Sequence, residues 1–163
     1  MPGKVASVEP LICPTVRQGV WMAAIRFLNV DLDVRSDRSL RSLTEDLALR
    51  GMFNLRPSDE QAGEQFACYE LDGHASTAQQ TLVAMLSILE AMSPDARETW
   101  DAATAREFNL GYDCGTEPWA YNDGVGPDVI RRVAELGGAL RITLYPEQSS
   151  LAKPPNAPTE PEE

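Results

Sequence analysis

Residues 127–146, PDVIRRVAELGGALRITLYP, change from a helical to an alternating hydrophobic pattern at a pair of glycines. The first half places its apolar residues on one helix face, and proline at its start suits a first turn, where a missing N–H costs nothing. Those apolar residues are Val129, Ile130, Val133 and Leu136. In the second half Leu140, Ile142 and Leu144 alternate with polar residues, as in a strand with one buried face. The folded part is therefore predicted to end in a helix and a strand whose apolar face meets that helix in the core.

Comparable patterns predict the earlier elements. Strands are expected in residues 20–33, 52–56, 64–71 and 107–115, and helices in residues 36–51, 77–92 and 93–100. The apolar phase switches within the first strand, between Phe27 and Leu28, which indicates a bulge or a strand covered on both faces. The resulting order, β-α-β-β-α-α-β-α-β, predicts an α+β fold. We expect a single mixed or antiparallel sheet with helices mainly on one face, ferredoxin-like with an added αβ unit.

Composition supports one folded domain over residues 19–146. The chain has 163 residues, of which 43% are hydrophobic, enough for a core of useful size. Residues 1–18 hold three prolines and no clear period, so they are expected to be an irregular lead-in without the apolar run of a signal peptide. Residues 147–163 are rich in proline and glutamate and are expected to be disordered. No run is long enough to span a membrane, and the expected location is cytoplasmic.

The charge balance disfavours two classes of partner. The chain has 25 acidic and 14 basic residues, for a formal net charge of -11. Nucleic-acid phosphates and anionic membrane surfaces would repel such a surface. A basic protein partner is favoured, because opposite fields speed and select encounters. The alternative is that the charge only keeps the protein in solution.

Candidate chemical groups are few. The cysteines, Cys13, Cys68 and Cys114, are too far apart in sequence to form a metal motif and fit reduced thiols. Cys114 and the single histidine, His74, are the only pair for nucleophilic catalysis, but a core cysteine and a turn histidine explain them better.

Three aspartates are candidate ligands of Mg²⁺ or Ca²⁺. Asp31 and Asp33 share a strand face, and Asp37 follows them closely. Arginines stand between them, and aspartates before a helix usually cap it. We therefore expect no catalytic residue, no cofactor and no metal.

One long stretch lacks positive charge. Residues 57–96 contain no lysine or arginine and seven carboxylates: Asp59, Glu60, Glu64, Glu70, Asp72, Glu90 and Asp95. These residues either form an acidic face for a basic partner or reflect a chance run of one sign. Asp59, Glu60 and Glu64 are the partner-binding candidates within the stretch.

A second candidate surface is the segment TEPWAYNDG, residues 116–124. It carries Trp119 and Tyr121 beside Glu117 and Asp123, outside any predicted element. Loops with large aromatic residues often serve in recognition. The alternative is that Trp119 folds back as a lid on the sheet.

The match GPDVIRRVAELGGALRITLY resembles the closing helix–strand unit of an uncharacterised bacterial domain family, and the helix TAQQTLVAMLSILEAM fits the same order. The chain departs from that family at RPSDEQAGE. Members of this kind occur among bacterial toxin-immunity repertoires, so the resemblance implies binding and not catalysis. The expected function is a non-enzymatic acidic protein-binding module, with an immunity-type inhibitor of a basic toxin as its concrete form. The alternatives are a small-ligand sensor and an enzyme with an unrecognised site.

Overall fold

The computed structural model describes residues 24–56, 64–73, 77–115 and 117–146. Their helices and strands follow the predicted order. The elements are β1 (Arg26–Ser36), α1 (Arg41–Leu49), β2 (Met52–Asn54), β3 (Gln65–Leu71), α2 (Ala78–Glu90), α3 (Pro94–Ala102), β4 (Ala105–Cys114), α4 (Pro127–Glu135) and β5 (Ala139–Pro146). The predictions for the lead-in at 1–18 and the tail at 147–163 fall outside the described residues.

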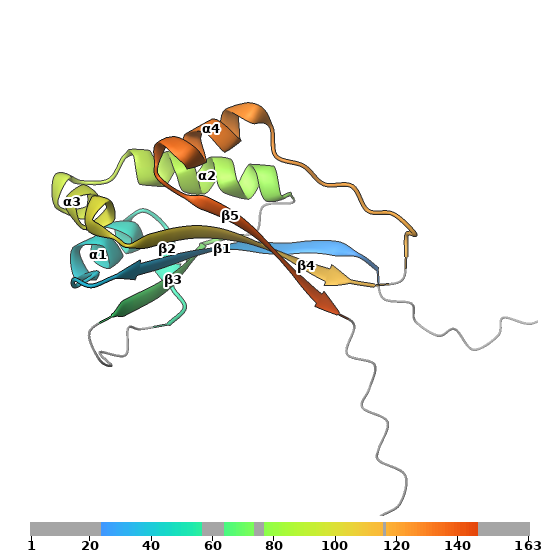
Figure 1. Ribbon diagram of the computed structural model, residues 1–163, viewed down its shortest axis with the longest axis horizontal. Coiled ribbons are helices and arrows are strands. Elements are labelled where there is room, and N and C mark those ends of the chain that lie inside the picture. The colour runs from blue at the N-terminus through green and yellow to red at the C-terminus, as the bar shows by residue number, and fades with distance from the viewer. Residues whose placement is uncertain (1–23, 57–63, 74–76, 116, 147–163) are drawn as a thin grey trace, which may run out of the picture.

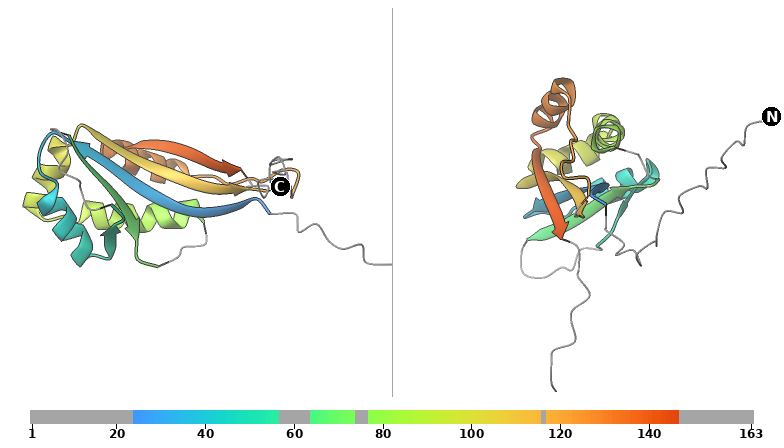
Figure 2. Two further views of the ribbon diagram at one scale, coloured as in Figure 1. Left: turned by 90° about the horizontal axis from the view of Figure 1, so that it is seen from below. Right: turned by 90° about the vertical axis from the view of Figure 1, so that its right-hand side faces the viewer.

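The strands form one mixed sheet in the order β2-β3-β1-β4-β5. β1 pairs antiparallel with β3 and β4, β2 pairs antiparallel with β3, and β5 pairs parallel with β4. Figure 1 shows α2 and α4 above the sheet and α1 and α3 toward one end of it. When the molecule is seen from below, in the left view of Figure 2, the strands lie nearest the viewer and the helices lie behind them. The predicted α+β class with a single mixed sheet is confirmed.

A bulge near the start of β1 explains the switch of apolar phase in the sequence. The pairing of β1 with β4 shifts register between Phe27 and Asn29. After the shift Val30 and Leu32 point into the core and are fully buried. Before it Phe27 faces the same side, with its ring 5.6 Å from that of Tyr112. The bulge alternative is therefore confirmed.

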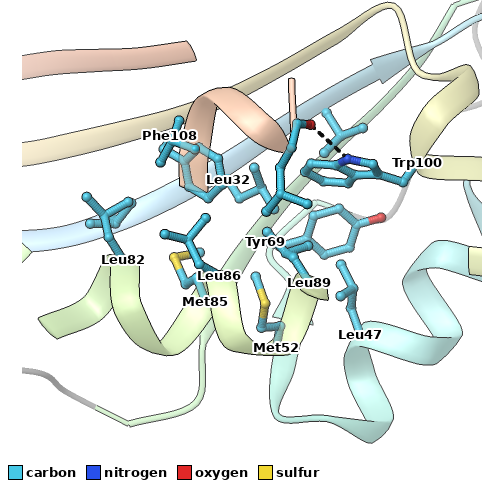
Figure 3. Close-up of a cluster of buried hydrophobic side chains, with 14 of the residues drawn as sticks. Leu32, Leu47, Met52, Tyr69, Leu82, Met85, Leu86, Leu89, Trp100 and Phe108 are labelled. Atoms are coloured by element: carbon cyan, nitrogen blue, oxygen red, sulfur yellow. Dashed lines mark hydrogen bonds between the residues drawn. The ribbon is translucent and has the colours of Figure 1, made fainter. Parts of the chain in front are cut away.

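α2 supplies the centre of the core (Figure 3). Its apolar stripe is fully buried: Leu82, Met85, Leu86 and Leu89. This stripe belongs to one cluster with Leu32 and Tyr69 of the sheet. Burial of each such side chain contributes about 1.5–3 kcal/mol, so this contact is the main source of stability in the domain.

Trp100 joins α3 to the end of α4. Its indole is fully buried, and its Nε1 donates a 3.0 Å hydrogen bond to the carbonyl oxygen of Leu136. A buried indole N–H needs such a partner, and this bond connects α3 to the C-terminal end of α4.

Side chains cap α2 and α3 but not α1. The side chains of Thr77 and Ser93 accept from backbone N–H groups at the starts of α2 and α3. β1 extends through Ser36, and α1 begins after Leu40 without a side-chain cap. The pairing of Ser36 with Gln65 of β3 takes it into the sheet instead.

Each glycine of the pair before β5 is required for a different reason. Gly137 has φ +69°, a left-handed conformation that ends α4 and that glycine adopts without strain. A Cβ on Gly138 would lie 2.7 Å from the ring of Phe108, so the backbone can approach β4 only without a side chain. Together they turn the chain sharply from α4 into β5.

The prediction that β5 lies in the core is wrong. The alternation is as expected, but β5 is an edge strand, and Ile142 is 66% and Leu144 62% exposed. Val129 and Val133 of α4 join the core cluster with Phe108 and Leu110 of β4, leaving the apolar side of β5 uncovered. Ile130, predicted to be in the buried stripe, is 47% exposed.

Among the described residues, none of the helices is both long enough and apolar enough to cross a membrane.

Candidate functional site

An apolar groove lies at the carboxyl ends of β4 and β5. It has a volume of about 320 Å³. Four segments that are distant in sequence supply its walls: the approach to β1, the end of β4, the loop before α4, and β5. We call it the Trp119 groove; its lining residues are Ile25, Tyr112, Cys114, Trp119, Ala120, Tyr121, Asp123, Ile142 and Leu144.

Aromatic rings and one hydrogen bond fix the floor of this groove. Tyr112 is nearly buried in β4, and its ring lies 5.9 Å from that of Tyr121 in an edge-to-face arrangement. Its hydroxyl donates a 2.8 Å hydrogen bond to Asp123 Oδ2. Burial, followed by this bond to a carboxylate, raises the pKa of Tyr112 far above its ordinary value. The hydroxyl therefore stays protonated and serves as a fixed donor.

Backbone contacts hold both ends of the loop formed by residues 117–126. The N–H of Ile25 donates to the carbonyl oxygen of Glu117 at 2.8 Å. At the other end the N–H of Gly126 donates to Oε1 of Gln79 in α2, also at 2.8 Å. The loop is therefore attached to the domain at two points, and its aromatic residues have defined positions.

Trp119 extends into solvent. Its side chain is 94% exposed, and it is the most exposed of the large apolar residues that the structure describes. The alternative in which Trp119 folds back as a lid is wrong. Tyr121 takes that position in part, since it is 39% exposed and rests on Tyr112.

The structure brings four of the seven predicted partner-binding residues together. Trp119, Tyr121 and Asp123 line the groove, and Glu117 is exposed two residues before Trp119. Neither Glu117 nor Asp123 forms a salt bridge with a described cation. The loop therefore carries two carboxylates without a described cationic partner, of which Asp123 already accepts hydrogen bonds from Tyr112 and Gly124.

The other three predicted residues are not part of this groove. Glu64 lies beside β3, with one carboxylate oxygen 3.6 Å from Nη1 of Arg35. Asp59 and Glu60 lie outside the described residues.

The acidic stretch does not form a single face over the residues that the structure describes. Glu70 points to the bare side of the sheet, because its neighbours Tyr69 and Leu71 pack on the helix side. Glu90 lies on the helix side and pairs with Arg132 of α4 at 2.7 Å. The stretch thus contributes to both sides of the domain, and Glu90 serves to fasten α4 to α2.

The bare side of the sheet carries a second group of carboxylates. Asp31 and Asp33 alternate with the buried residues of β1, and Asp31 is paired across the sheet with Asn109. Partial burial, then repulsion from Glu70 and Asp33, raises the pKa of Asp31 to about 6. Within the described ranges, however, no three acidic, cysteine or histidine side chains are grouped as metal ligands.

Of the described cysteines, Cys68 is unsuited to nucleophilic chemistry. Burial, then its contact with Asp33, raises the pKa of its thiol to about 12, so that the reactive thiolate is absent near neutral pH. Cys114 lines the groove as a half-buried free thiol. His74, which was considered as its base, lies outside the described residues.

Sequence reasoning missed the contributions of Ile25, Tyr112, Ile142 and Leu144. Tyr112 and Ile142 were expected on core-facing strand positions, and that periodicity is correct. The sequence pattern shows which strand residues face the helices, but it does not show which of them a helix covers. The groove is lined by strand residues on the helix side that no described helix covers completely.

Comparisons of this chain with protein families, with curated proteins and with solved structures find no match.

Proposed function

We propose that this chain is a non-enzymatic protein-binding module whose Trp119 groove receives an apolar and basic segment of a partner protein. The observation that supports this most is the position of Trp119, 94% exposed on a loop that is fixed at both ends. A tryptophan side chain has only two χ angles, so covering it costs little conformational entropy for the area it contributes. Tryptophan and tyrosine are also the residues that most often dominate binding energy at interfaces.

The apolar surface suits a side chain of the partner. Ile142 and Leu144 expose more than half of their surface next to Trp119, so a partner can cover them at no cost to the core. Removing such surface from water contributes about 25 cal/mol per Å². A partner residue that enters the groove would thus contact Trp119, Tyr121 and β5 together.

The charge at the rim suits a lysine or arginine in the partner. Asp123 lines the groove with Trp119 and Tyr121, Glu117 lies two residues before Trp119, and a cation over an aromatic ring contributes about 0.5–2 kcal/mol. The net charge of -11 would attract a basic protein from a distance. In its most concrete form, the proposal is an immunity-type inhibitor that neutralises a basic bacterial toxin, which the family resemblance favours.

A small-ligand sensor is the second candidate, because the groove volume of about 320 Å³ lies at the low end of the range for small-molecule sites. Such sites usually enclose most of the ligand surface. Here three of the lining side chains, Trp119, Ile142 and Leu144, point largely into solvent. This geometry suits a macromolecular partner better.

The proposal can be tested by capturing partners from the native host on immobilised protein. Wild type, Trp119→Ala and Leu49→Ala should be compared, because Leu49 is 88% exposed on α1 and provides a matched loss of apolar surface. The predicted partner binds wild type and Leu49→Ala alike and elutes with rising salt. Trp119→Ala should weaken its purified complex by 2 kcal/mol or more, about 30-fold in Kd. Equal binding by all three proteins would contradict the proposal.

A further inference from the structure

The two edges of the sheet differ in their protection. β2 is three residues long, and a short edge strand offers little for another strand to pair with. β5 has eight residues and one charge, Arg141, whose side chain pairs with Glu107 on the bare side at 2.8 Å. Over the residues that the structure describes, no strand pairs with the outer edge of β5. Its outward backbone groups are therefore available to another strand.

The helix side of β5 carries unburied apolar side chains. Leu140, Ile142 and Leu144 are 39%, 66% and 62% exposed. Ile130 of α4 adds to them, because at 100° per residue it points about 160° away from Arg132, which holds Glu90 of α2. It therefore faces the outer side, above β5. We call Ile130, Leu140, Ile142 and Leu144 the β5 edge strip.

The charge around this strip differs from that of the whole chain. Residues 127–146 contain three arginines and two acids, Asp128 and Glu135, and two of the arginines pair with Glu90 and Glu107, so the unit and these partners carry 3 − 4 = −1. The whole chain has a charge of -11, so the remaining residues carry -10. Two copies would repel each other electrostatically over most of their surfaces, but only weakly where the segments 127–146 meet. A strongly basic partner, in contrast, finds little excess of acid here.

We propose that two copies of this chain pair their β5 strands antiparallel about a two-fold axis at Ile142. In a two-fold antiparallel pair the same face of both sheets points the same way, so apolar residues meet apolar residues. Ile142 then faces its counterpart, and Leu140 faces Leu144 of the other copy. Arg141 faces Thr143 of the other copy. The two five-stranded sheets become one continuous sheet, with both β5 edge strips on its helix side.

Charge and backbone donors disfavour the two axes next to Ile142. An axis at Arg141 would place that arginine opposite its own copy, and like charges directly opposite are destabilising. An axis at Thr143 would place Leu140 opposite Pro146, which has no N–H to donate. Ile142 avoids both. The Trp119 groove shares Ile142 and Leu144 with the β5 edge strip, but the dimer also depends on the free backbone edge of β5, which the proposed function does not use.

Sedimentation of the full-length protein tests the dimer. Wild type should sediment at twice the chain mass of 17.9 kDa at concentrations on the order of 100 µM, well above the Kd of even a modest interface. Ile142→Lys and Ile142→Glu should each be monomeric, because like charges then meet on the axis. An equimolar mixture of the two should recover the dimer mass. Phe53→Lys, at an exposed position on the β2 edge, should remain dimeric.

A second measurement does not depend on destabilising the strand. Ile142→Cys should form a disulfide between its two copies that peptide mass spectrometry locates at position 142. Leu140→Cys should form none at position 140 on its own, because it faces Leu144 of the other copy. A monomeric wild type, a dimer that persists in both charged variants, or cross-linking at 140 as strong as at 142 would each overturn the proposal. If a charged variant loses its native circular dichroism spectrum, the cysteine pair decides alone.

Discussion

The hydroxyl of Tyr112 in the sheet donates a 2.8 Å hydrogen bond to Asp123 Oδ2 and thereby connects the sheet to the loop that carries Trp119. Tyr112 comes from β4 and Asp123 from the loop before α4. Asp123 also accepts from the N–H of Gly124 with its other oxygen, so its carboxylate is held at both atoms. This pair makes the loop part of the domain.

Tyr112→Phe should therefore loosen the loop while leaving the core packing intact. The lost bond involves a charged acceptor, so we expect a loss of about 1–3 kcal/mol in the free energy of unfolding, measured by denaturant titration. Partner binding should weaken as well, because the loop would lose its fixed position. Tyr121→Phe removes a hydroxyl that forms no hydrogen bond to a described side chain and should change stability by less than about 0.5 kcal/mol. Equal effects of the two variants would contradict this role for Tyr112.

Asp31 should make stability fall as pH rises. Its folded pKa of about 6 lies above the ordinary value of 3.8 for an aspartate, so folding favours the protonated form. The contribution is complete below pH 3.8 and is lost as pH rises through about 6. Asp31→Asn should accordingly stabilise the protein at pH 8 by on the order of 1 kcal/mol, since water screens a half-exposed carboxylate. Denaturant titrations between pH 5 and pH 8 avoid the carboxylates with lowered pKa, Asp46 and Glu90, which act at lower pH.

The exposed Asp72, changed to Asn, is the matched control for that comparison. It should change the free energy of unfolding at pH 8 by less than about 0.5 kcal/mol. If Asp31→Asn is neutral or destabilising at pH 8, the carboxylates on the bare side of the sheet do not disfavour folding.

The positions of β5 and α2 predict opposite responses to shortening an apolar side chain. Leu86→Ala in the stripe of α2 should lower the free energy of unfolding by about 2–5 kcal/mol, because it leaves a cavity at a fully buried position. Ile142→Ala, on a side chain that is 66% exposed, should cost less than about 1 kcal/mol in a sample dilute enough to be monomeric. Thermal or denaturant unfolding measures both. A cost for Ile142→Ala near that of Leu86→Ala would mean that β5 is covered in the monomer.

Charge reversal should act on the rate at which a partner associates. Asp59, Glu60 and Glu64 replaced by lysine would lower the attraction at a distance, so the association rate should fall and its dependence on salt should flatten. Replacing Glu117 and Asp123 should also speed dissociation, because those residues stand at the groove. Stopped-flow or surface binding kinetics separate the two effects. Unchanged association in the triple variant would remove the acidic stretch from the interface.

The sequence predicts the local elements well because each has its own periodic signal. The stripe of α2, the proline at the start of α3 and the glycines after α4 all act within a few residues of the positions they specify. The bulge in β1 was also visible, as a change of phase at Phe27 and Leu28. Strand order has no such local signal. Leu140, Ile142 and Leu144 alternate as they would in a central strand, and only the sheet order places them at an edge.

One part of the groove can be predicted from the sequence, because its residues are close together in the chain. Trp119, Tyr121, Glu117 and Asp123 stand together in sequence, so their proximity needed no fold. Ile25 and Leu144 reach the groove only because β1 and β5 both flank β4. The acidic stretch, which the sequence allows as an acidic face or as a chance run of one sign, contributes to two sides of the domain over the described residues, because β3 and α2 lie in different layers.

Hydrogen exchange of the complex with its captured partner is the most direct measurement of the central claim, that partners bind at the Trp119 groove. Exchange of the free protein and of the complex should be compared peptide by peptide. The account predicts that protection is greatest at residues 117–126 and 142–146, with little change in α1 or in β3. Protection of β3 or α1 with unchanged exchange at residues 117–126 would contradict it.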